Sequence, residues 1–288
     1  MTGNNNRSTL KQQLRQYGIH LSKHRGQSLL LDNSVLATIV SACELDNQDI
    51  IIEIGSGTGN LTAELAQQAH QVYALEIDRR MYQLATANLR SYSNITLIQD
   101  DALAYNFNEV VKSHPDSPLK ITGNLPYSIT TPILIKVVEN QVLFSRAVFM
   151  IQREVAERLI ASPGTKEYGV LTISIAYRYQ SAIVGYVPAK SFFPVPEVDS
   201  AIIKLIPHKI PPVLVDDEKF FFRIVKVAFS QRRKTLLNNL ITISHQLNLD
   251  KPELEKVLID IAIDPKRRGE TLSIAEFAKL ANLLKKQI

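Results

Sequence analysis

The chain has 288 residues, of which 45% are hydrophobic, so it can bury one large core or a large core and a smaller one. No run of 18 or more apolar residues occurs, which excludes a membrane-spanning helix, and we expect no membrane partner. The formal net charge of +5 favours an anionic partner, most commonly nucleic acid. The single cysteine, Cys43, lies in an apolar helical pattern; it excludes a disulfide framework within the chain and predicts a cytoplasmic protein.

The N-terminal segment is polar and basic. We expect residues 1–9 to be disordered and residues 10–17 to form a short basic helix. The tripeptide Lys23-His24-Arg25 could be a solvated patch or could contact phosphate. A helix capped by Asp32 is predicted to end at Cys43.

A glycine-rich turn follows the most regular strand pattern in the chain. Residues 50–54 are four isoleucines and Glu53, a pattern typical of a buried parallel strand. Three glycines follow at alternate positions, Gly55, Gly57 and Gly59. A helix is predicted over residues 60–69. Strand, glycine turn and helix together form the nucleotide cradle of an α/β sheet, because glycine lets the backbone approach a ligand closely.

The spacing of this turn separates two classes of cofactor. It reads G-x-G-x-G instead of the dinucleotide pattern G-x-G-x-x-G, and Glu53 directly before it would repel a pyrophosphate. An E-x-G-x-G-x-G turn is typical of methyltransferases that use S-adenosylmethionine, whose methionine end is cationic. A glycine turn without a ligand stays open as an alternative. We therefore predict S-adenosylmethionine bound near Gly55 and Gly57, and no metal ion.

Acidic residues end the next two predicted strands. The strand at 71–75 ends on Glu76, which at this distance from the glycine turn is placed to accept hydrogen bonds from two ribose hydroxyls. The strand at 95–99 ends on Asp100 and Asp101, at the sheet edge where ligands bind in open α/β folds. We predict that Asp101 accepts a hydrogen bond from the adenine amino group, and that Asp100 is solvated.

The tetrapeptide Asn124-Leu125-Pro126-Tyr127 is the most specific signal in the chain. It follows a short predicted strand at 119–123, and a helix is predicted to begin near residue 130. Asn-x-Pro-Tyr at the end of the fourth strand of such a sheet is a signature of enzymes that methylate exocyclic amino groups. Elsewhere in a chain the same four residues would indicate only a turn.

The rest of the first part alternates strand and helix patterns. Strands are predicted at 147–151, 182–187 and 199–206, and helices at 153–161 and 169–179. The loop at 192–198 is rich in proline, and its aromatic residue Phe192 could wall a base pocket.

A proline-rich linker at 207–212 predicts a boundary between residues 1–207, a catalytic domain that binds S-adenosylmethionine, and residues 208–288, a small helical RNA-binding domain. Helical patterns in the second part cover 219–229, 234–243, 252–259 and 274–285. Its basic clusters could be solvated faces, but beside an RNA-type catalytic motif they favour phosphate contacts. The predicted RNA-binding residues are Arg232, Arg233, Lys234, Arg267 and Arg268.

Taken together, these motifs resemble the KsgA family of ribosomal small-subunit RNA adenine N6,N6-dimethyltransferases, from Gly26 to about Leu283. The family motif F-x-P-x-P-x-V-x-S is similar to residues 192–200, and residues 233–236 and 264–272 are similar to further family motifs. The resemblance implies a Rossmann-like α/β methyltransferase sheet with a small all-α C-terminal domain. It also implies dimethylation of two adjacent adenosines near the 3′ end of 16S RNA, in a small-subunit particle, with a role in small-subunit biogenesis. Nothing in the sequence demands more than a monomer.

One segment departs from the family pattern. Where the family usually has G-Q-N-F-L, this chain has Gly26-Gln27-Ser28-Leu29-Leu30. The family's asparagine contacts the cofactor, so the resemblance implies cofactor contacts by Ser28 and Leu30, and Asn124 is predicted to contact the cofactor as well. Because serine is shorter, the departure bears on cofactor affinity and not on the type of reaction.

The tetrapeptide suggests how an amino nitrogen is made reactive. The adenine amino nitrogen is a poor nucleophile, because its lone pair is delocalised into the ring. We predict that the side-chain oxygen of Asn124 and the carbonyl of Leu125 accept its two hydrogens, which favours a tetrahedral nitrogen. Pro126 would stiffen the turn, while Tyr127 and Phe192 would stack on the extruded base.

Other readings use the same residues. A large-subunit RNA methyltransferase of the macrolide-resistance type shares the turn and the tetrapeptide but commonly has Ile at the position of Leu125. A DNA adenine methyltransferase more often has Asp in place of Asn124. A non-catalytic ribosome-assembly factor would keep the fold but not need the intact site, and a nicotinamide dehydrogenase is disfavoured by the turn spacing and by Glu53.

Overall fold

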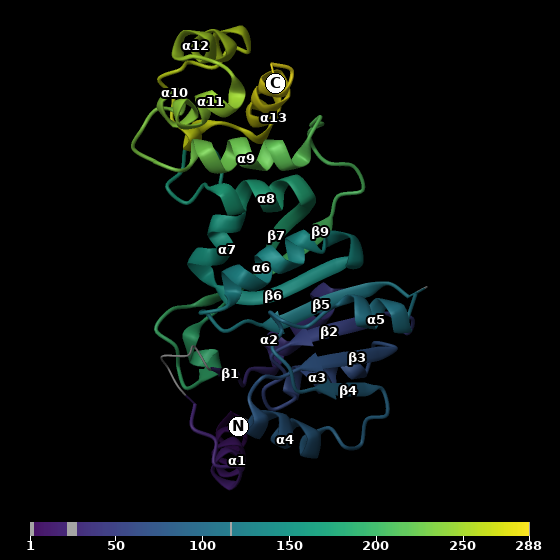
Figure 1. Cartoon of the computed structure of the whole chain (residues 1–288). Helices are drawn as coiled ribbons and strands as arrows, with labels where there is room; N and C mark the ends of the chain where they lie inside the picture. The colour runs from purple at the N-terminus through teal and green to yellow at the C-terminus, as the bar shows by residue number, and fades with distance from the viewer. Residues whose placement is uncertain (1–2, 22–27, 116, 288) are drawn as a thin grey trace. The chain divides into compact units, whose positions relative to one another are not determined.

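The computed structural model describes residues 3–21, 28–115 and 117–287 (Figure 1). Contacts between residues divide the chain into two units, residues 1–156 with 181–207, and residues 157–180 with 208–288. The chain passes from the first unit to the second for the last time between residues 207 and 208, where the sequence pattern also placed the domain boundary. The structure differs in the segment 157–180, which clusters with the C-terminal helices although the sequence pattern placed it in the first domain.

The first unit is built on a seven-stranded sheet. Its strands, in spatial order, are β4 (Ile95–Ile98), β3 (Gln71–Leu75), β2 (Ile50–Ile54), β5 (Leu119–Asn124), β6 (Arg146–Gln152), β9 (Ser200–Pro207) and β7 (Tyr179–Val187). The strands from β4 to β6 are parallel, and β9 runs antiparallel to β6. The chain adds strands on one side of β2 and then on the other, so the order reverses between β2 and β5. In open α/β sheets ligands bind at such a switch point, at the carboxyl ends of the strands.

The central strand β2 shows why this sequence forms a buried parallel sheet. All five of its residues are buried, and Ile50 is in register with Gln71 of β3 and with Leu119 of β5. An apolar run with no polar alternation suits a strand that is covered on both faces. The one charged member, Glu53, is also buried.

Helices of the first unit connect and cover these strands. They are α1 (Gly3–Gln16), α2 (Asn33–Cys43), α3 (Asn60–Ala66), α4 (Arg79–Asn88), α5 (Asn108–Ser113) and α6 (Thr130–Glu139), with 3₁₀ turns η2 (Gln141–Leu143) and η3 (Ala189–Ser191). Helix α7 (Arg153–Leu159) contains residues 156 and 157, between which the chain first passes from the first unit to the second. The predicted cap of α2 is present, since the Asp32 side chain accepts a hydrogen bond from the Ser34 N–H at 3.1 Å.

The N-terminal helix corrects one expectation. Residues 3–9 belong to α1, although their polar composition predicted disorder. Helix α1 buries Leu10 and Leu14 in a cluster with Met81 and Leu84 of α4. This burial stabilises a helix that its polar composition alone would not favour.

A short antiparallel ribbon joins distant parts of the first unit. Strand β1 (Leu29–Leu30) pairs with β8 (Phe192–Phe193), with Leu29 opposite Phe193 and Leu30 opposite Phe192. The ribbon therefore fixes the segment after residue 27 against the loop before β9.

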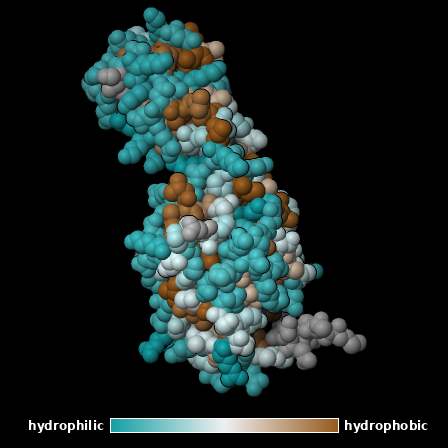
Figure 2. Space-filling model, turned by 90° about the vertical axis from the view of Figure 1, so that its right-hand side faces the viewer, coloured by the Kyte–Doolittle hydropathy of each residue, from teal (hydrophilic) through white to brown (hydrophobic). Residues whose placement is uncertain are grey.

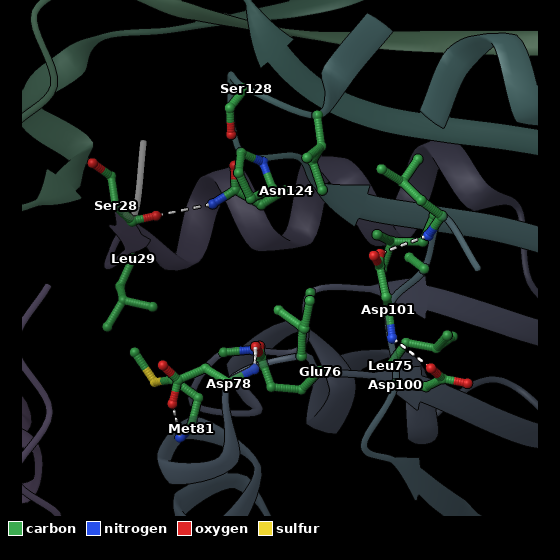
Figure 3. Close-up of a pocket in the computed structure, with 18 of the residues that line it drawn as sticks. Ser28, Leu29, Leu75, Glu76, Asp78, Met81, Asp100, Asp101, Asn124 and Ser128 are labelled. Carbon is green, nitrogen blue, oxygen red and sulfur yellow. Dashed lines mark hydrogen bonds between the residues drawn. The ribbon is translucent and has the colours of Figure 1, made fainter. Parts of the chain in front are cut away.

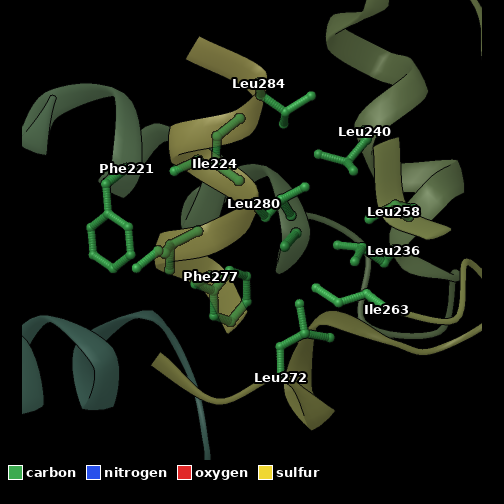
Figure 4. Close-up of a cluster of buried hydrophobic side chains, with 14 of the residues drawn as sticks. Phe221, Ile224, Leu236, Leu240, Leu258, Ile263, Leu272, Phe277, Leu280 and Leu284 are labelled. Carbon is green, nitrogen blue, oxygen red and sulfur yellow. The ribbon is translucent and has the colours of Figure 1, made fainter. Parts of the chain in front are cut away.

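Apart from the first residues of β7, the regular secondary structure in the described residues of the second unit is helical. Its helices are α8 (Val170–Arg178), α9 (Glu218–Ala228), α10 (Leu236–Leu240), α11 (Ser244–Leu247), α12 (Lys251–Asp260) and α13 (Ile274–Lys285), with 3₁₀ turns η4 (Ile241–Ile243) and η5 (Gly269–Thr271). Figure 4 shows side chains of α9, α10, α12 and α13 meeting in one core, among them Phe221, Leu240, Leu258 and Leu280. The predicted α/β sheet and helical C-terminal part are thus both present.

Surface hydropathy agrees with a chain that exposes mainly polar groups. On the face in Figure 2, hydrophilic residues predominate and hydrophobic ones form small separate groups. Within the described ranges, no helix has both the length and the apolar character needed to traverse a bilayer.

Candidate active site

A pocket of about 590 Å³ opens where β2, β3, β4 and β5 end (Figure 3). This volume lies in the range of sites for small molecules and cofactors. The lining residues within three positions of these strand ends include Gly55, Gly57, Glu76, Asp100, Asp101 and Asn124. With Ser28 and Pro126, which also line it, seven of the predicted site residues from distant parts of the sequence share one cavity at the switch point of the sheet.

The glycine turn forms one wall of this pocket. Gly55 and Gly57 have φ of 77° and 55°, a left-handed region that other residues rarely adopt. A Cβ atom on Gly57 would also lie 3.1 Å from the Leu29 side chain. The turn thus keeps its backbone at the pocket surface, with no side chain between it and a ligand.

Glu76 is held at the opposite side of the turn. Its carboxylate accepts a hydrogen bond from the Gly57 N–H and another from the Asp78 N–H, each at 2.9 Å. Burial raises the pKa of Glu76, and the two N–H groups partly offset that effect. Each carboxylate oxygen keeps a lone pair. The side chain can therefore accept two further hydrogen bonds from a ligand diol.

Ile77 is a pocket residue that the sequence interpretation missed. It is 66% exposed, although it directly follows a buried strand and a buried acid, and it lines the same pocket. An exposed apolar side chain beside ligand-binding carboxylates can cover the face of a flat ring. Its position immediately after the acid at the strand tip was the available signal.

Just after β4, the Asp101 carboxylate forms a hydrogen bond with the backbone two residues further along the chain. Its Oδ1 accepts a hydrogen bond from the Leu103 N–H at 2.8 Å, and its own N–H donates to Asp100 Oδ1 at 2.7 Å. Figure 3 shows both bonds at the pocket wall. Asp100 is exposed, as expected, yet it too lines the pocket.

The Asn124 amide is oriented by a contact with Ser28. Asn124 Nδ2 donates to the Ser28 carbonyl at 3.1 Å (Figure 3). A carbonyl can only accept, so the amide nitrogen must face Ser28 and Oδ1 must face away from it. The contact uses the backbone of Ser28, so the serine-for-asparagine departure does not alter this bond.

The rest of the tetrapeptide is anchored by backbone contacts. The Leu125 N–H donates to the Met150 carbonyl at 3.0 Å, and the Leu125 side chain is buried. The Pro126 carbonyl accepts from Thr130 Oγ1 at 3.1 Å, and Pro126 also lines the pocket. Tyr127 is half-buried, with its hydroxyl 3.5 Å from Ser200 Oγ. The tetrapeptide therefore joins the pocket to β6 and β9.

Two predicted site residues lie in the core instead of the pocket. Phe192 is 2% exposed and Leu30 is 8% exposed, and both belong to the cluster between α2 and the sheet. The physical reason is the β1–β8 ribbon, which pairs Leu30 with Phe192 and turns both side chains inward. Their neighbour Leu29 lines the pocket. Gly26, Gln27 and the tripeptide at 23–25 lie outside the described residues.

The buried acid Glu53 weakens one argument used for the sequence. Its Oε2 accepts a hydrogen bond from Thr62 Oγ1 at 2.5 Å. Burial raises the pKa of Glu53 to about 7, and the negative charge of Glu76 adds to this rise. At neutral pH Glu53 is therefore charged only part of the time, and it repels a pyrophosphate less than its position in the sequence suggested.

This raised pKa predicts a pH-dependent stability. A carboxyl whose pKa is about 7 when folded and 4.5 otherwise stabilises the fold fully below pH 4.5, and that contribution is lost as the pH rises through about 7. Because Gln has no such titration, we expect the free energy of unfolding of Glu53→Gln to rise, relative to that of the wild type, by up to about 3 kcal/mol between pH 5 and pH 8. Urea unfolding of both proteins at several pH values measures this. Glu64→Gln, on the exposed face of α3, is the control, and a difference that stays constant with pH would contradict the prediction.

The predicted RNA-binding residues of the second unit fall into two groups. Arg232 donates to Glu270 Oε2 at 2.9 Å and to the Lys166 carbonyl at 2.8 Å. Arg267 pairs with Glu276 and also donates to Thr271. These two guanidinium groups hold the unit together. By contrast Arg233, Lys234 and Arg268 are exposed, and none has an ion pair with another described residue.

Across residues 3–21, 28–115 and 117–287, no group of three or more His, Cys, Asp or Glu side chains is arranged to hold a metal ion. Cys43 is buried, and burial raises the pKa of its thiol to about 12.

Comparison with known proteins finds similarity over nearly the whole chain. The family model described as "Ribosomal RNA adenine dimethylase" matches residues 19–280. A protein of Geobacillus sp. (strain WCH70) named "Ribosomal RNA small subunit methyltransferase A" is 44% identical over 273 residues, which are 94% of each chain. The protein of that name from Streptococcus pneumoniae (strain P1031) is 42% identical over 282 residues, 97% of each chain.

Two solved structures are similar in fold and in sequence. A dimethyladenosine transferase from Plasmodium falciparum has a TM-score of 0.78 and 30% identity, covering 90% of this chain and 98% of its own. The 23S rRNA methyltransferase ErmE has a TM-score of 0.69 and 25% identity, covering 89% and 99%. The predicted Rossmann-like methyltransferase fold is confirmed by these likenesses.

Proposed function

The chain belongs to the ribosomal RNA adenine dimethylase family, and we propose on this premise that it dimethylates N6 of two adjacent adenosines near the 3′ end of small-subunit ribosomal RNA. The resemblance predicted from the motifs is thereby confirmed. The observation that carries the proposal is the position of residues 124–127. Asn124 ends β5, and Asn124 and Pro126 line the pocket that the glycine turn, Glu76 and Asp101 also line.

The pocket residues fit S-adenosylmethionine by their chemistry. Glu76 would accept hydrogen bonds from the ribose hydroxyls, and Asp101 from the adenine amino group. Ile77 would cover the adenine face, while Gly55 and Gly57 leave backbone room beside the ribose and methionine. When bound, this cofactor supplies an electrophilic methyl carbon on a sulfonium. The sulfonium and the ammonium are cations, which suits a pocket with four carboxylates on its wall, those of Glu76, Asp78, Asp100 and Asp101.

Residues 124 and 125 would activate the target nitrogen. Asn124 Oδ1 faces away from Ser28 and is therefore free to accept one amino hydrogen, and the Leu125 carbonyl would accept the other. Two acceptors favour a tetrahedral nitrogen with a localised lone pair. Pro126 fixes the turn, and Tyr127 would stack on the extruded base, a contact worth about 1–3 kcal/mol. Phe192 would join this stack only after leaving the core, so its role stays a prediction.

Two classes of alternative are less well supported. ErmE shows that a large-subunit enzyme shares the fold, but its 25% identity is lower than the 42% and 44% of the small-subunit relatives. A non-catalytic assembly factor would not require Glu76, Asp101 and Asn124 to share one pocket, as they do here.

This function implies an RNA partner and a separate role for each of the two parts of the chain. An RNA substrate is implied by the family, and a 30S-type particle in the cytoplasm, bound by a monomer, is our finer proposal. We assign cofactor binding and catalysis to the first unit, residues 1–156 with 181–207, and RNA binding to residues 208–288 of the second unit. Exposed Arg233, Lys234 and Arg268 are the phosphate contacts that we favour.

Methyl transfer to isolated ribosomal subunits tests the function. Small subunits that lack the modification are incubated with the enzyme and methyl-labelled S-adenosylmethionine, and the labelled nucleotides are then mapped. We expect N6,N6-dimethyladenosine at two adjacent positions near the 3′ end. Label in large subunits alone would support the macrolide-resistance reading, and no label in either subunit would contradict an active methyltransferase.

The two groups of basic residues give different expected results. Removing Arg233 and Lys234 together should weaken RNA binding. It should also make the negative slope of log affinity against log salt shallower by about two, one for each lost phosphate contact. Arg232→Ala should instead lower the free energy of unfolding and leave the slope unchanged, because Arg232 bonds to Glu270 and Lys166. Filter binding at several salt concentrations measures both. Equal slopes for the double variant and the wild type would exclude these residues as phosphate contacts.

A further inference from the structure

The ammonium group of Lys136, on α6, donates all of its hydrogen bonds to one backbone turn, residues 102–105. Its Nζ donates to the carbonyls of Ala102, Leu103 and Tyr105 at 3.0, 2.8 and 2.6 Å. An ammonium has three N–H donors, so all three are satisfied by this turn. The same nitrogen lies 4.7 Å from the centre of the Phe107 ring, within range of a cation–π contact. A cation bound so completely by one turn fixes the conformation of that turn.

The turn held by Lys136 carries Asp101 and part of the pocket wall. The N–H groups of Ala104 and Tyr105 donate to the Asp101 carbonyl at 2.9 and 2.8 Å, and the Leu103 N–H donates to Asp101 Oδ1 at 2.8 Å. The Ala102 carbonyl and the Leu103 N–H belong to one trans peptide plane and therefore point in opposite directions. When Lys136 holds the carbonyl, the N–H on the other side is directed to the Asp101 carboxylate.

We propose that Lys136 is a positioning residue for recognition of the cofactor's adenine. By binding three carbonyls it sets the turn so that the Leu103 N–H fixes Oδ1 of Asp101, and Oδ2 is left for the exocyclic amino group. The inference rests on the proposed function only in taking S-adenosylmethionine as the ligand. Lys136 does not line the pocket, so it acts through Asp101 and not on the ligand.

The same lysine joins the two halves of the site. Helix α6 begins three residues after Tyr127, and its first residue, Thr130, donates to the Pro126 carbonyl. Lys136 lies near the other end of this helix. The adenine wall and the tetrapeptide that would hold the target base are therefore fixed to one short rigid element, which keeps their spacing constant.

Discrimination between two product analogues tests this role. S-Adenosylhomocysteine carries the amino group, whereas its analogue with unsubstituted purine has only a C–H at that position and no N1–H, so it offers Asp101 no N–H donor there. Calorimetry with the wild type should show at least tenfold tighter binding of the first compound, because a site built for an N–H rejects an analogue that lacks it. In Lys136→Met, which keeps the chain length but has no donor, we expect this ratio to fall at least fivefold. Lys136→Arg, which keeps donors, should retain more of it.

Three controls separate positioning from a general structural role. Lys112→Met, on the exposed side of α5, should keep the wild-type ratio. Asp101→Ala should bind the two compounds with similar affinity. Adding Lys136→Met to Asp101→Ala should not change the ratio of the two affinities further. If Lys136→Met does not fold, Lys136→Leu, which also has no donor, takes its place in the same series. Weaker binding of both compounds with an unchanged ratio would overturn the proposal. Failure of the wild type to bind either compound would instead contradict the proposed function.

Discussion

Asn124→Ala is expected to slow methyl transfer by about 100-fold, a size typical of losing one preorganised hydrogen bond to the reacting group. Asn124 Oδ1 is the acceptor that the Ser28 contact turns away from the backbone, and alanine removes it. Glu76 and Asp101 keep their places, because neither bonds to Asn124, so the dissociation constant for S-adenosylhomocysteine should change less than threefold. Single-turnover methylation and calorimetry measure the two effects separately.

Two further variants test the orientation argument for Asn124. Asn124→Asp keeps an acceptor but sets a carboxylate oxygen against the Ser28 carbonyl, so we expect partial activity together with lower thermal stability. Asn108→Ala, on exposed α5, should leave both rate and affinity unchanged. A parental rate for Asn124→Ala would remove residue 124 from the mechanism, whatever the affinity of that variant.

The sequence was sufficient to predict the parts of the site that follow strands. Glu76, Asp101 and Asn124 lie at or shortly after the ends of strands that the sequence predicted, and parallel strands bring their carboxyl ends to one edge. Such residues can be placed in the same pocket without knowing how any side chain packs. The glycine turn was predictable for the same reason, since its spacing requires backbone conformations that the structure contains.

The contacts that packing decides were not predictable in this way. Phe192 and Leu30 lie in proline- or leucine-rich segments with no clear period, and only their pairing across β1 and β8 shows that both face the core. Lys136 looked like an ordinary helix residue, because its carbonyl partners are 31 to 34 positions away in the sequence. Arg267 looked like its neighbour Arg268, and only Glu276 distinguishes them.

Gly123→Ala is expected to cost about 3 kcal/mol or more of stability and to weaken cofactor binding at least tenfold. A Cβ atom there would lie 2.5 Å from the Ile54 carbonyl oxygen, and backbone in a buried strand cannot rotate away as a side chain can. Relief of the clash must move β2 and β5 apart where they present Gly55 and Asn124 to the pocket. Gly185→Ala in β7 is the matched control, because its Cβ would meet only ordinary contacts at 3.8 Å. It should stay within about 1 kcal/mol of the wild type. If urea unfolding ranked the two alanine variants as equally stable, the close approach of β2 and β5 at this position would not be the constraint that shapes the site.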